Sequence, residues 1–146
     1  MLILVARNIT AQDVATDGVV NLGSVYRKYC KCIDGVKTFD FNATSIALQT
    51  QGVYEINVEI TFTGDAAGIA TFELTQNGEE LLGATASETI TTADTEVRSV
   101  SLLGYSLVDT TCLLGRLTNL IQNISVVNTG IAVNVTNIVI SVKKVV

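Results

Sequence analysis

The sequence contains no histidine, no proline and no tryptophan, and only 5% of its 146 residues are aromatic. Without an imidazole, the chain cannot form a Ser-His-Asp triad, a Cys-His pair or a histidine-ligated metal site. Those arrangements are the commonest routes to nucleophilic and zinc catalysis. The sequence therefore predicts a protein that is not an enzyme.

Positive charge is also scarce, with 9 basic against 14 acidic residues and a net charge of −5. Its main concentration is Arg27, Lys28, Lys31 and Lys37, which is too sparse to follow a phosphate backbone. No apolar run approaches the ~20 residues of a membrane span. The stretch 1–6 lacks the basic and long apolar regions of a signal peptide. We expect neither a nucleic-acid nor a membrane partner.

Three cysteines are present, and Cys30 and Cys32 are separated by one residue rather than by the two of a metal knuckle or redox loop. In a strand, their side chains would point to the same face and behave as small buried hydrophobes. With Cys112 the count is odd, which favours assembly in a reducing cytoplasm.

The acidic residues do not form a recognisable site. Glu55 and Glu59 would lie about 13 Å apart on one strand face, beyond the usual separation in glycosidases. The segment 13–18 lacks the ligand spacing of a calcium loop, and no glycine lies in a phosphate-binding motif. We expect no metal and no cofactor.

What the chain does have is β-branched residues, with 19 valines, 13 isoleucines and 19 threonines. Apolar and polar residues alternate from Val53 to Thr63, which predicts a half-buried strand. After a turn at 65–68, alternation resumes over 70–75, so we expect these two strands to be antiparallel neighbours. Asn77-Gly78 predicts a type I′ turn, with 81–86 returning beside 70–76.

The rest of the chain also reads mostly as short strands. We expect a loop or weak edge strand at 87–96, a strand at 97–108 with a bulge at Gly104, and a turn at 109–111. The stretch 112–123 fits a helix about as well as a strand. Both faces of the last strand are apolar, so it should be central. Further strands are expected at 19–22, 24–33, 37–41, 45–49, 124–127, 131–135 and 138–145. About ten short strands without a linker predict a single sandwich or barrel domain over 1–146.

Two segments resemble the tumour-necrosis-factor-like family, which includes the globular heads of complement-type proteins. The run 45–60, with Gly52-Val53-Tyr54 opening a strand, is similar to the entry into that family's central strand. The run 130–145 is similar to its last two strands. The resemblance implies an all-β antiparallel jelly-roll sandwich that forms homotrimers. Small Thr- and Asn-rich proteins of this pattern also resemble bacteriophage virion components.

Composition supports assembly independently. Of the residues, 48% are hydrophobic and only 16% are charged, and so few charged side chains cover the surface of a small monomer poorly. By the resemblance, the strand that opens at Tyr54 and the closing strand lie on the sheet that faces the three-fold axis. Six side chains are therefore candidates for either domain core or trimer interface: Tyr54, Ile56, Val58, Ile138, Ile140 and Val142.

The basic strip Arg27, Lys28 and Lys31 is interleaved with tyrosines and has three interpretations. It is an aromatic and basic cluster that stacks on bases or sugars, an edge strand protected by charge, or a contact for an acidic shell surface. We accordingly expect a non-enzymatic structural virion protein, a trimeric capsid decoration or head-fibre module. It would be assembled in the bacterial host cytoplasm and would contact virion proteins such as the major capsid protein. The alternative is a tail or baseplate receptor-binding module for a host glycan or protein, for which 4 Tyr and 4 Phe are a thin aromatic supply.

Overall fold

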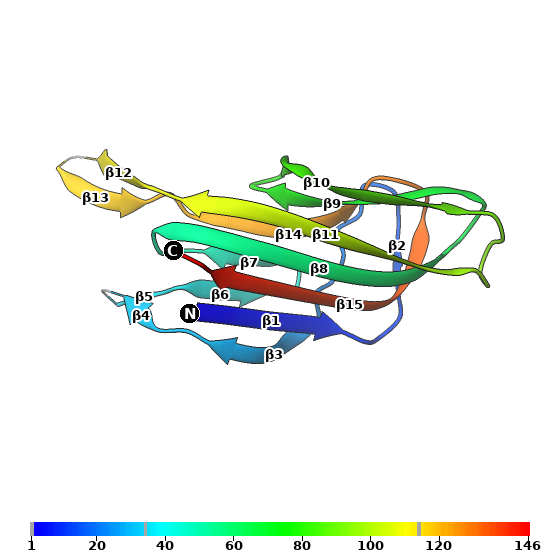
Figure 1. Ribbon diagram of the computed structural model, residues 1–146, viewed down its shortest axis with the longest axis horizontal. Coiled ribbons are helices and arrows are strands. Elements are labelled where there is room, and N and C mark those ends of the chain that lie inside the picture. The colour runs from blue at the N-terminus through cyan, green and yellow to red at the C-terminus, as the bar shows by residue number, and fades with distance from the viewer. Residues whose placement is uncertain (1, 34, 114) are drawn as a thin grey trace.

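The computed structural model describes residues 2–33, 35–113 and 115–146, and all regular structure in these ranges is β. Five strands of the first sheet run side by side, and β2 pairs at one end of β15 (Figure 1). The spatial order of the five is β11 (Val97–Val108), β8 (Gly52–Gly64), β15 (Val133–Lys144), β1 (Leu2–Asn8) and β3 (Ser24–Tyr29). The short strand β2 (Gln12–Val14) lies outside this order and pairs with β15.

A five-stranded second sheet packs against the first, and all named strand pairs are antiparallel. Its order is β10 (Glu79–Ile90), β9 (Gly68–Gln76), β14 (Gln122–Asn128), β7 (Ser45–Leu48) and β6 (Phe39–Asn42). Two small hairpins complete the described structure: β4 (Cys32–Ile33) with β5 (Val36–Lys37), and β12 (Thr110–Leu113) with β13 (Arg116–Asn119). The β12–β13 hairpin extends beyond the two sheets at the end of the molecule where both termini lie (Figure 1).

The core lies between the sheets and follows from strand alternation. On β8 every second residue from Tyr54 to Phe62 is buried, and on β9 the same holds for Ala70, Phe72 and Leu74. The rings of Phe62 and Phe72 meet edge to face across the two sheets, with their centroids 5.0 Å apart. Burial of these apolar side chains is the main favourable contribution to the stability of the sandwich.

Several sequence expectations are confirmed. The hairpin at Asn77-Gly78 joins β9 to β10, and both residues have positive φ, as a type I′ turn requires. The last strand, β15, is central, since it lies between β8 and β1. The expected strands 131–135 and 138–145 form the single strand β15, with an irregularity between Val135 and Asn137.

The predicted pairing of β8 with β9 is wrong. The turn at 65–67 carries the chain from the first sheet to the second, where β9 pairs with β10 and β14. Strand β8 instead pairs with β11 and β15. The reason is that two amphipathic strands can also bury their apolar faces by facing each other across a sandwich.

Three local expectations are wrong, and two that were left open are settled. The segment 112–123, which fits a helix or a strand by sequence, contributes to the strands β12, β13 and β14 in its described residues. Thr110 already lies in β12 rather than in a turn. The chain at 19–22 forms only a bridge from Val19 to Val127. Pairing of β11 with β8 runs unbroken through Gly104, so no bulge occurs there. Residues 87–90 are the end of β10, which lies at the edge of the second sheet, in agreement with the edge-strand alternative for 87–96.

Cysteine burial differs between the two described thiols. Cys30 packs partly against the core, whereas Cys32 is exposed, because β3 ends at Tyr29 and a new hairpin begins at Cys32. The expectation that both are buried on one face is therefore wrong for Cys32. The side chain of Cys112 lies outside the described residues.

Candidate functional site: the outer face of the first sheet

The first sheet exposes several apolar side chains on the side that faces away from the second sheet, with polar residues between them on β8 and β15. On β11 the side chains of Leu103, Tyr105 and Leu107 are 50%, 56% and 56% exposed. Strand register places Tyr105 opposite Glu55 and Leu107 opposite Val53. We call this surface the outer face and define its apolar part as Ile3, Val5, Val53, Leu103, Tyr105, Leu107 and Val139.

The inward side of β11 is less apolar than its outward side. Between the buried residues Leu102 and Val108, the inward positions are Gly104 and Ser106. The hydroxyl of Ser106 is buried and donates a hydrogen bond of 2.7 Å to Gln76 Oε1. Hydrophobic side chains thus lie on the solvent side of this strand, while a glycine and a serine lie on its inward side.

The other end of the outer face is polar. Ser101 Oγ donates to Glu59 Oε1 at 2.7 Å, and the hydroxyls of Thr61 and Ser99 lie 3.1 Å apart. Most of the apolar side chains lie in the half of the sheet near the chain termini, where Glu55 and Lys143 separate Tyr105 from Ile3, while Val139 lies opposite Glu59.

The six residues predicted as core or trimer interface all lie in the interior of the single chain. Each is no more than 1% exposed: Tyr54, Ile56, Val58, Ile138, Ile140 and Val142. They lie on β8 and β15, and their side chains point between the two sheets. Alternate neighbours on those strands, such as Val53 and Val139, form the outer face instead.

The predicted basic strip lies on both sides of the edge strand β3 and just beyond its end. Arg27 and Lys28 are consecutive on β3 and so point to opposite sides, and Lys31 is exposed beyond its end. Since β3 pairs only with β1 among the described strands, the interpretation of a charged edge strand fits this geometry.

Sequence reasoning missed Arg7 at this edge. Its guanidinium carbon lies 4.0 Å from the ring centroid of Tyr26, and that of Arg27 lies 5.4 Å from the same centroid. Two cations therefore share one aromatic ring. Arg7 lies on β1, and only the register between β1 and β3 brings it here.

Exposed aromatics are also more numerous than expected. Tyr26, Tyr29 and Tyr105 are each at least half exposed, and only Tyr54 of the four tyrosines is buried. All three exposed rings belong to the first sheet or its edge. Alternation along 97–108 could have signalled Tyr105, because it shares a face with Leu103 and Leu107.

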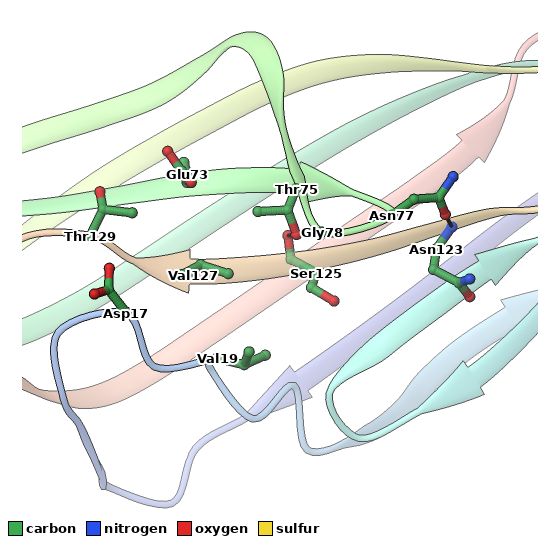
Figure 2. A pocket seen from close by; sticks show the side chains of 10 residues that line it. All are labelled: Asp17, Val19, Glu73, Thr75, Asn77, Gly78, Asn123, Ser125, Val127 and Thr129. Carbon is green, nitrogen blue, oxygen red and sulfur yellow. Dashed lines mark hydrogen bonds between the residues drawn. The ribbon is translucent and has the colours of Figure 1, made fainter.

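A polar groove lies on the second sheet, on its solvent side (Figure 2). It has a volume of about 640 Å³ and is bounded by β9, β14, the turn at 77–78 and the loop 15–19. Burial raises the pKa of the Glu73 carboxyl in this groove, and the negative charges of Glu80 and Asp17 raise it further. Among the described residues, no group of three or more Cys, Asp or Glu side chains could hold a metal ion.

In the ranges that the structure covers, no helix has the length and apolarity needed to cross a bilayer.

Comparison with known proteins identifies the fold. The sequence matches no protein-family model and no curated protein. Among solved structures, the globular domain of a zebrafish complement 1qA protein is similar at a TM-score of 0.62 and 9% identity, over 100% of this chain and 98% of that one. Murine APRIL is similar at a TM-score of 0.65 and 11% identity, over 97% of this chain and 98% of that one.

A viral protein shows the same likeness. The vertex protein P5 of PRD1 matches at a TM-score of 0.53 and 14% identity, over 99% of this chain and 97% of that one. At such identities the likeness concerns the fold alone. The two antiparallel sheets and these neighbours together confirm the all-β jelly roll of the tumour-necrosis-factor and C1q type that the sequence predicted.

Proposed function

From a jelly roll of the tumour-necrosis-factor and C1q type, we propose a non-enzymatic structural module that forms a homotrimer through its outer face and serves as a capsid decoration or head-fibre component of a phage particle. The observation that carries the proposal is the exposure of Leu103, Tyr105 and Leu107 on a strand whose inward side holds Gly104 and Ser106.

Self-association is favoured by the extent of the apolar surface. The apolar side chains of the outer face lie on β11, β8, β15 and β1, and the charged pair Glu55 and Lys143 lies between Tyr105 and Ile3 in strand register. Monomeric soluble proteins rarely expose contiguous apolar patches larger than a few hundred Å², and larger patches mark interaction sites. Covering this surface with an identical copy removes it from water in a closed symmetric assembly.

Three copies are favoured by the fold. Proteins with the jelly roll of the tumour-necrosis-factor and C1q type typically form homotrimers. In a cyclic trimer each chain uses two different surface patches, so the edge at β11 of one copy would pack on the outer face of the next.

A location on the virion is supported by the likeness to the vertex protein P5 of PRD1. For attachment, the edge at β3 offers four cations, Arg7, Arg27, Lys28 and Lys31, while the chain as a whole carries a charge of −5. A basic edge on an acidic protein selects an acidic surface, such as one on the major capsid protein, by electrostatic complementarity.

Light scattering after size exclusion tests the trimer. The wild-type chain should have about three times its 15.5 kDa mass. The double variant Leu103→Asp and Tyr105→Glu should be a folded monomer, because it places charges within an apolar contact. As a matched control, Ile69→Asp changes an equally exposed apolar side chain on the second sheet and should remain trimeric. A wild-type monomer contradicts the proposal.

Co-sedimentation with virions of the phage that carries this gene tests the attachment. Charge reversal at Arg27, Lys28 and Lys31 should leave the mass in solution unchanged but abolish binding to the particle, and binding of the wild type should weaken as salt rises. Reversal of Lys37, on the neighbouring hairpin, is the matched control and should bind as the wild type does. Undiminished binding of the triple variant would exclude the basic edge as the contact.

A further inference from the structure

The groove on the second sheet has rigid walls. Backbone hydrogen bonds fix the loop 15–19 against β14: Asp17 N donates to Asn128 O at 2.7 Å, and Val20 N donates to Val126 O at 2.8 Å. A bridge between Val19 and Val127 joins the loop to the floor of the groove. The site is therefore formed before any ligand arrives, which lowers the entropic cost of binding.

The far end of the groove is held by an amide network (Figure 2). Asn123 N donates to Asn77 Oδ1 at 2.8 Å, and Asn77 Nδ2 donates to Gln122 Oε1 at 2.7 Å. These bonds satisfy Asn77 within the protein. The side-chain amide of Asn123 makes no hydrogen bond to the described residues, so its donors and its acceptor are available.

Three more side chains in the groove have unused hydrogen-bonding capacity. Asp17, Glu73 and Thr129 lie toward the opposite end from Asn123 (Figure 2), and their side chains make no hydrogen bond or ion pair to the described part of the chain. Between the two ends, Val19 and Val127 contribute an apolar strip. The groove thus combines carboxylate, hydroxyl and amide groups with a small apolar surface.

This lining selects a class of ligand. Pockets for apolar metabolites are lined mainly by hydrophobic and aromatic residues, whereas seven of the ten residues that line this groove are polar or charged. The carboxylates at one end and the Asn123 amide at the other can bond several hydroxyls of one ligand, while the apolar strip can contact its C–H groups. Since no Lys or Arg lines the groove, its two carboxylates repel anions.

We propose that this groove binds a saccharide that carries no negative charge, with amino sugars preferred over neutral ones. Glu73 and Asp17 accept hydrogen bonds from its ammonium or hydroxyl groups, and Asn123 bonds a hydroxyl at the other end of the groove. The inference goes beyond the structural role and does not depend on the number of subunits.

The position of the groove is compatible with assembly. It lies on β9 and β14 of the second sheet, whereas the outer face belongs to the first sheet, on the opposite side of the sandwich. A trimer formed through the outer face leaves three grooves accessible. Weak individual sites could then act together on a surface that displays many copies of the sugar.

Saturation-transfer NMR and calorimetry on the intact chain at pH 7 test the proposal. The probes are a glucosamine tetramer, an N-acetylglucosamine tetramer and sialyllactose, which are cationic, neutral and anionic respectively. The first should bind more tightly than the second at millimolar concentration, and the third should not bind. Binding of sialyllactose as tight as that of the other two, or binding of none of the three, would overturn the proposal.

Variants locate the site. Asp17→Asn with Glu73→Gln should weaken binding of the glucosamine tetramer at least about tenfold, because both charges are lost while hydrogen-bonding groups of the same shape remain. Asparagine tolerates the positive φ of 64° at position 17. Glu88→Gln, on β10 and outside the groove, is the matched control. Unchanged affinity in the double variant, with its melting temperature retained, would exclude this groove.

Asn123→Ala separates charge from shape. Removing this amide should weaken the binding of the cationic tetramer and of the neutral tetramer by a similar factor, because each would form a hydrogen bond to the amide through a hydroxyl. The mass of each variant in solution is measured on the same samples. A trimer that binds no sugar overturns only the groove, whereas a monomer that binds the sugar overturns only the proposed assembly.

Discussion

The hydroxyl of Tyr54 donates a hydrogen bond of 2.5 Å to the carbonyl oxygen of Thr50 and lies 2.9 Å from the hydroxyl of the same residue. Both residues are buried, and the Tyr54 ring meets Phe39 edge to face at 5.9 Å. Burial raises the pKa of Tyr54, while its hydrogen bonds to Thr50 act in the opposite direction. The start of β8 is thereby tied to the end of the loop that follows β7.

Tyr54→Phe should lower the free energy of unfolding by about 1–3 kcal/mol, because it leaves the buried carbonyl of Thr50 without its donor. Urea denaturation at pH 7 measures the change. Tyr29→Phe is the control, because its exposed hydroxyl makes no hydrogen bond to the described residues and its loss should change stability by less than about 0.5 kcal/mol. Equal effects of the two variants would contradict the role given to the Tyr54 hydroxyl.

Substitution of the buried amide of Asn128 should also lower the free energy of unfolding. Its Nδ2 donates to Ile131 O at 2.8 Å and to Val14 O at 3.2 Å, and its Oδ1 accepts from Gly130 N at 3.0 Å. Asn128→Ala removes these bonds together and should cost about 2–4 kcal/mol of unfolding free energy.

Asn128→Asp extends the test, since a carboxylate cannot donate to the carbonyl oxygens and should be at least as destabilising as alanine. Thermal denaturation measures both. Asn123→Ala serves as control, because that amide is exposed and bonds no described residue, and it should leave the melting temperature nearly unchanged. An Asn128→Ala variant as stable as this control would contradict the prediction.

Gly104 marks a close approach of β11 to β10. A Cβ built there would lie 2.7 Å from Leu81 Cδ2, 3.1 Å from Leu74 Cδ1 and 3.3 Å from Ala84 Cβ. Gly104→Ala should therefore destabilise the protein by about 1–3 kcal/mol through overpacking. Combining it with Leu81→Ala should cost less than the sum of the two single variants, which a double-mutant cycle in urea measures. Strict additivity would show that the two side chains do not collide.

The alternation in Val53–Thr63 was sufficient to predict strand β8 and which of its residues are buried, because period-2 patterning is a local property. Its partners were not predictable in the same way. The turn at 65–67 has the length of a hairpin turn, but the chain changes sheets there. Sheet membership depends on burying the inner faces of both sheets at once, and that involves segments distant in the sequence.

Strand β11 shows why the candidate site was only partly predictable. The alternation of 97–108 separates Leu103, Tyr105 and Leu107 from Gly104 and Ser106, but hydrophobicity alone would place the first group inside. The structure does the reverse, because Leu81 and Leu74 already fill the space beside Gly104. Packing against another sheet therefore decided the orientation. The groove was missed for a related reason, since the loop 15–19 and the turn 77–78 meet only across β14 and β9.

Glu96 organises the loop between β10 and β11 and should control part of the response to acid. Its carboxylate accepts hydrogen bonds from Thr91 N at 2.6 Å and from Thr92 N at 3.4 Å, and it pairs with Arg98 at 2.7 Å. The hydrogen bond from the Thr91 backbone is the largest of the contacts that lower the pKa of Glu96 to about 2.

Because the folded-state pKa lies below the ordinary value of 4.5, the stability that Glu96 contributes is fully present above about pH 4.5 and is lost as pH falls through about 2. Glu96→Gln should be less stable than the wild type at pH 7, and the difference should shrink toward pH 2. Urea denaturation between pH 7 and pH 2 measures it. Glu88→Gln removes one charge but none of these hydrogen bonds, and so controls for net charge. If the difference in unfolding free energy between Glu96→Gln and the wild type stays constant down to pH 2, the Thr91 contact does not act through the ionised carboxylate.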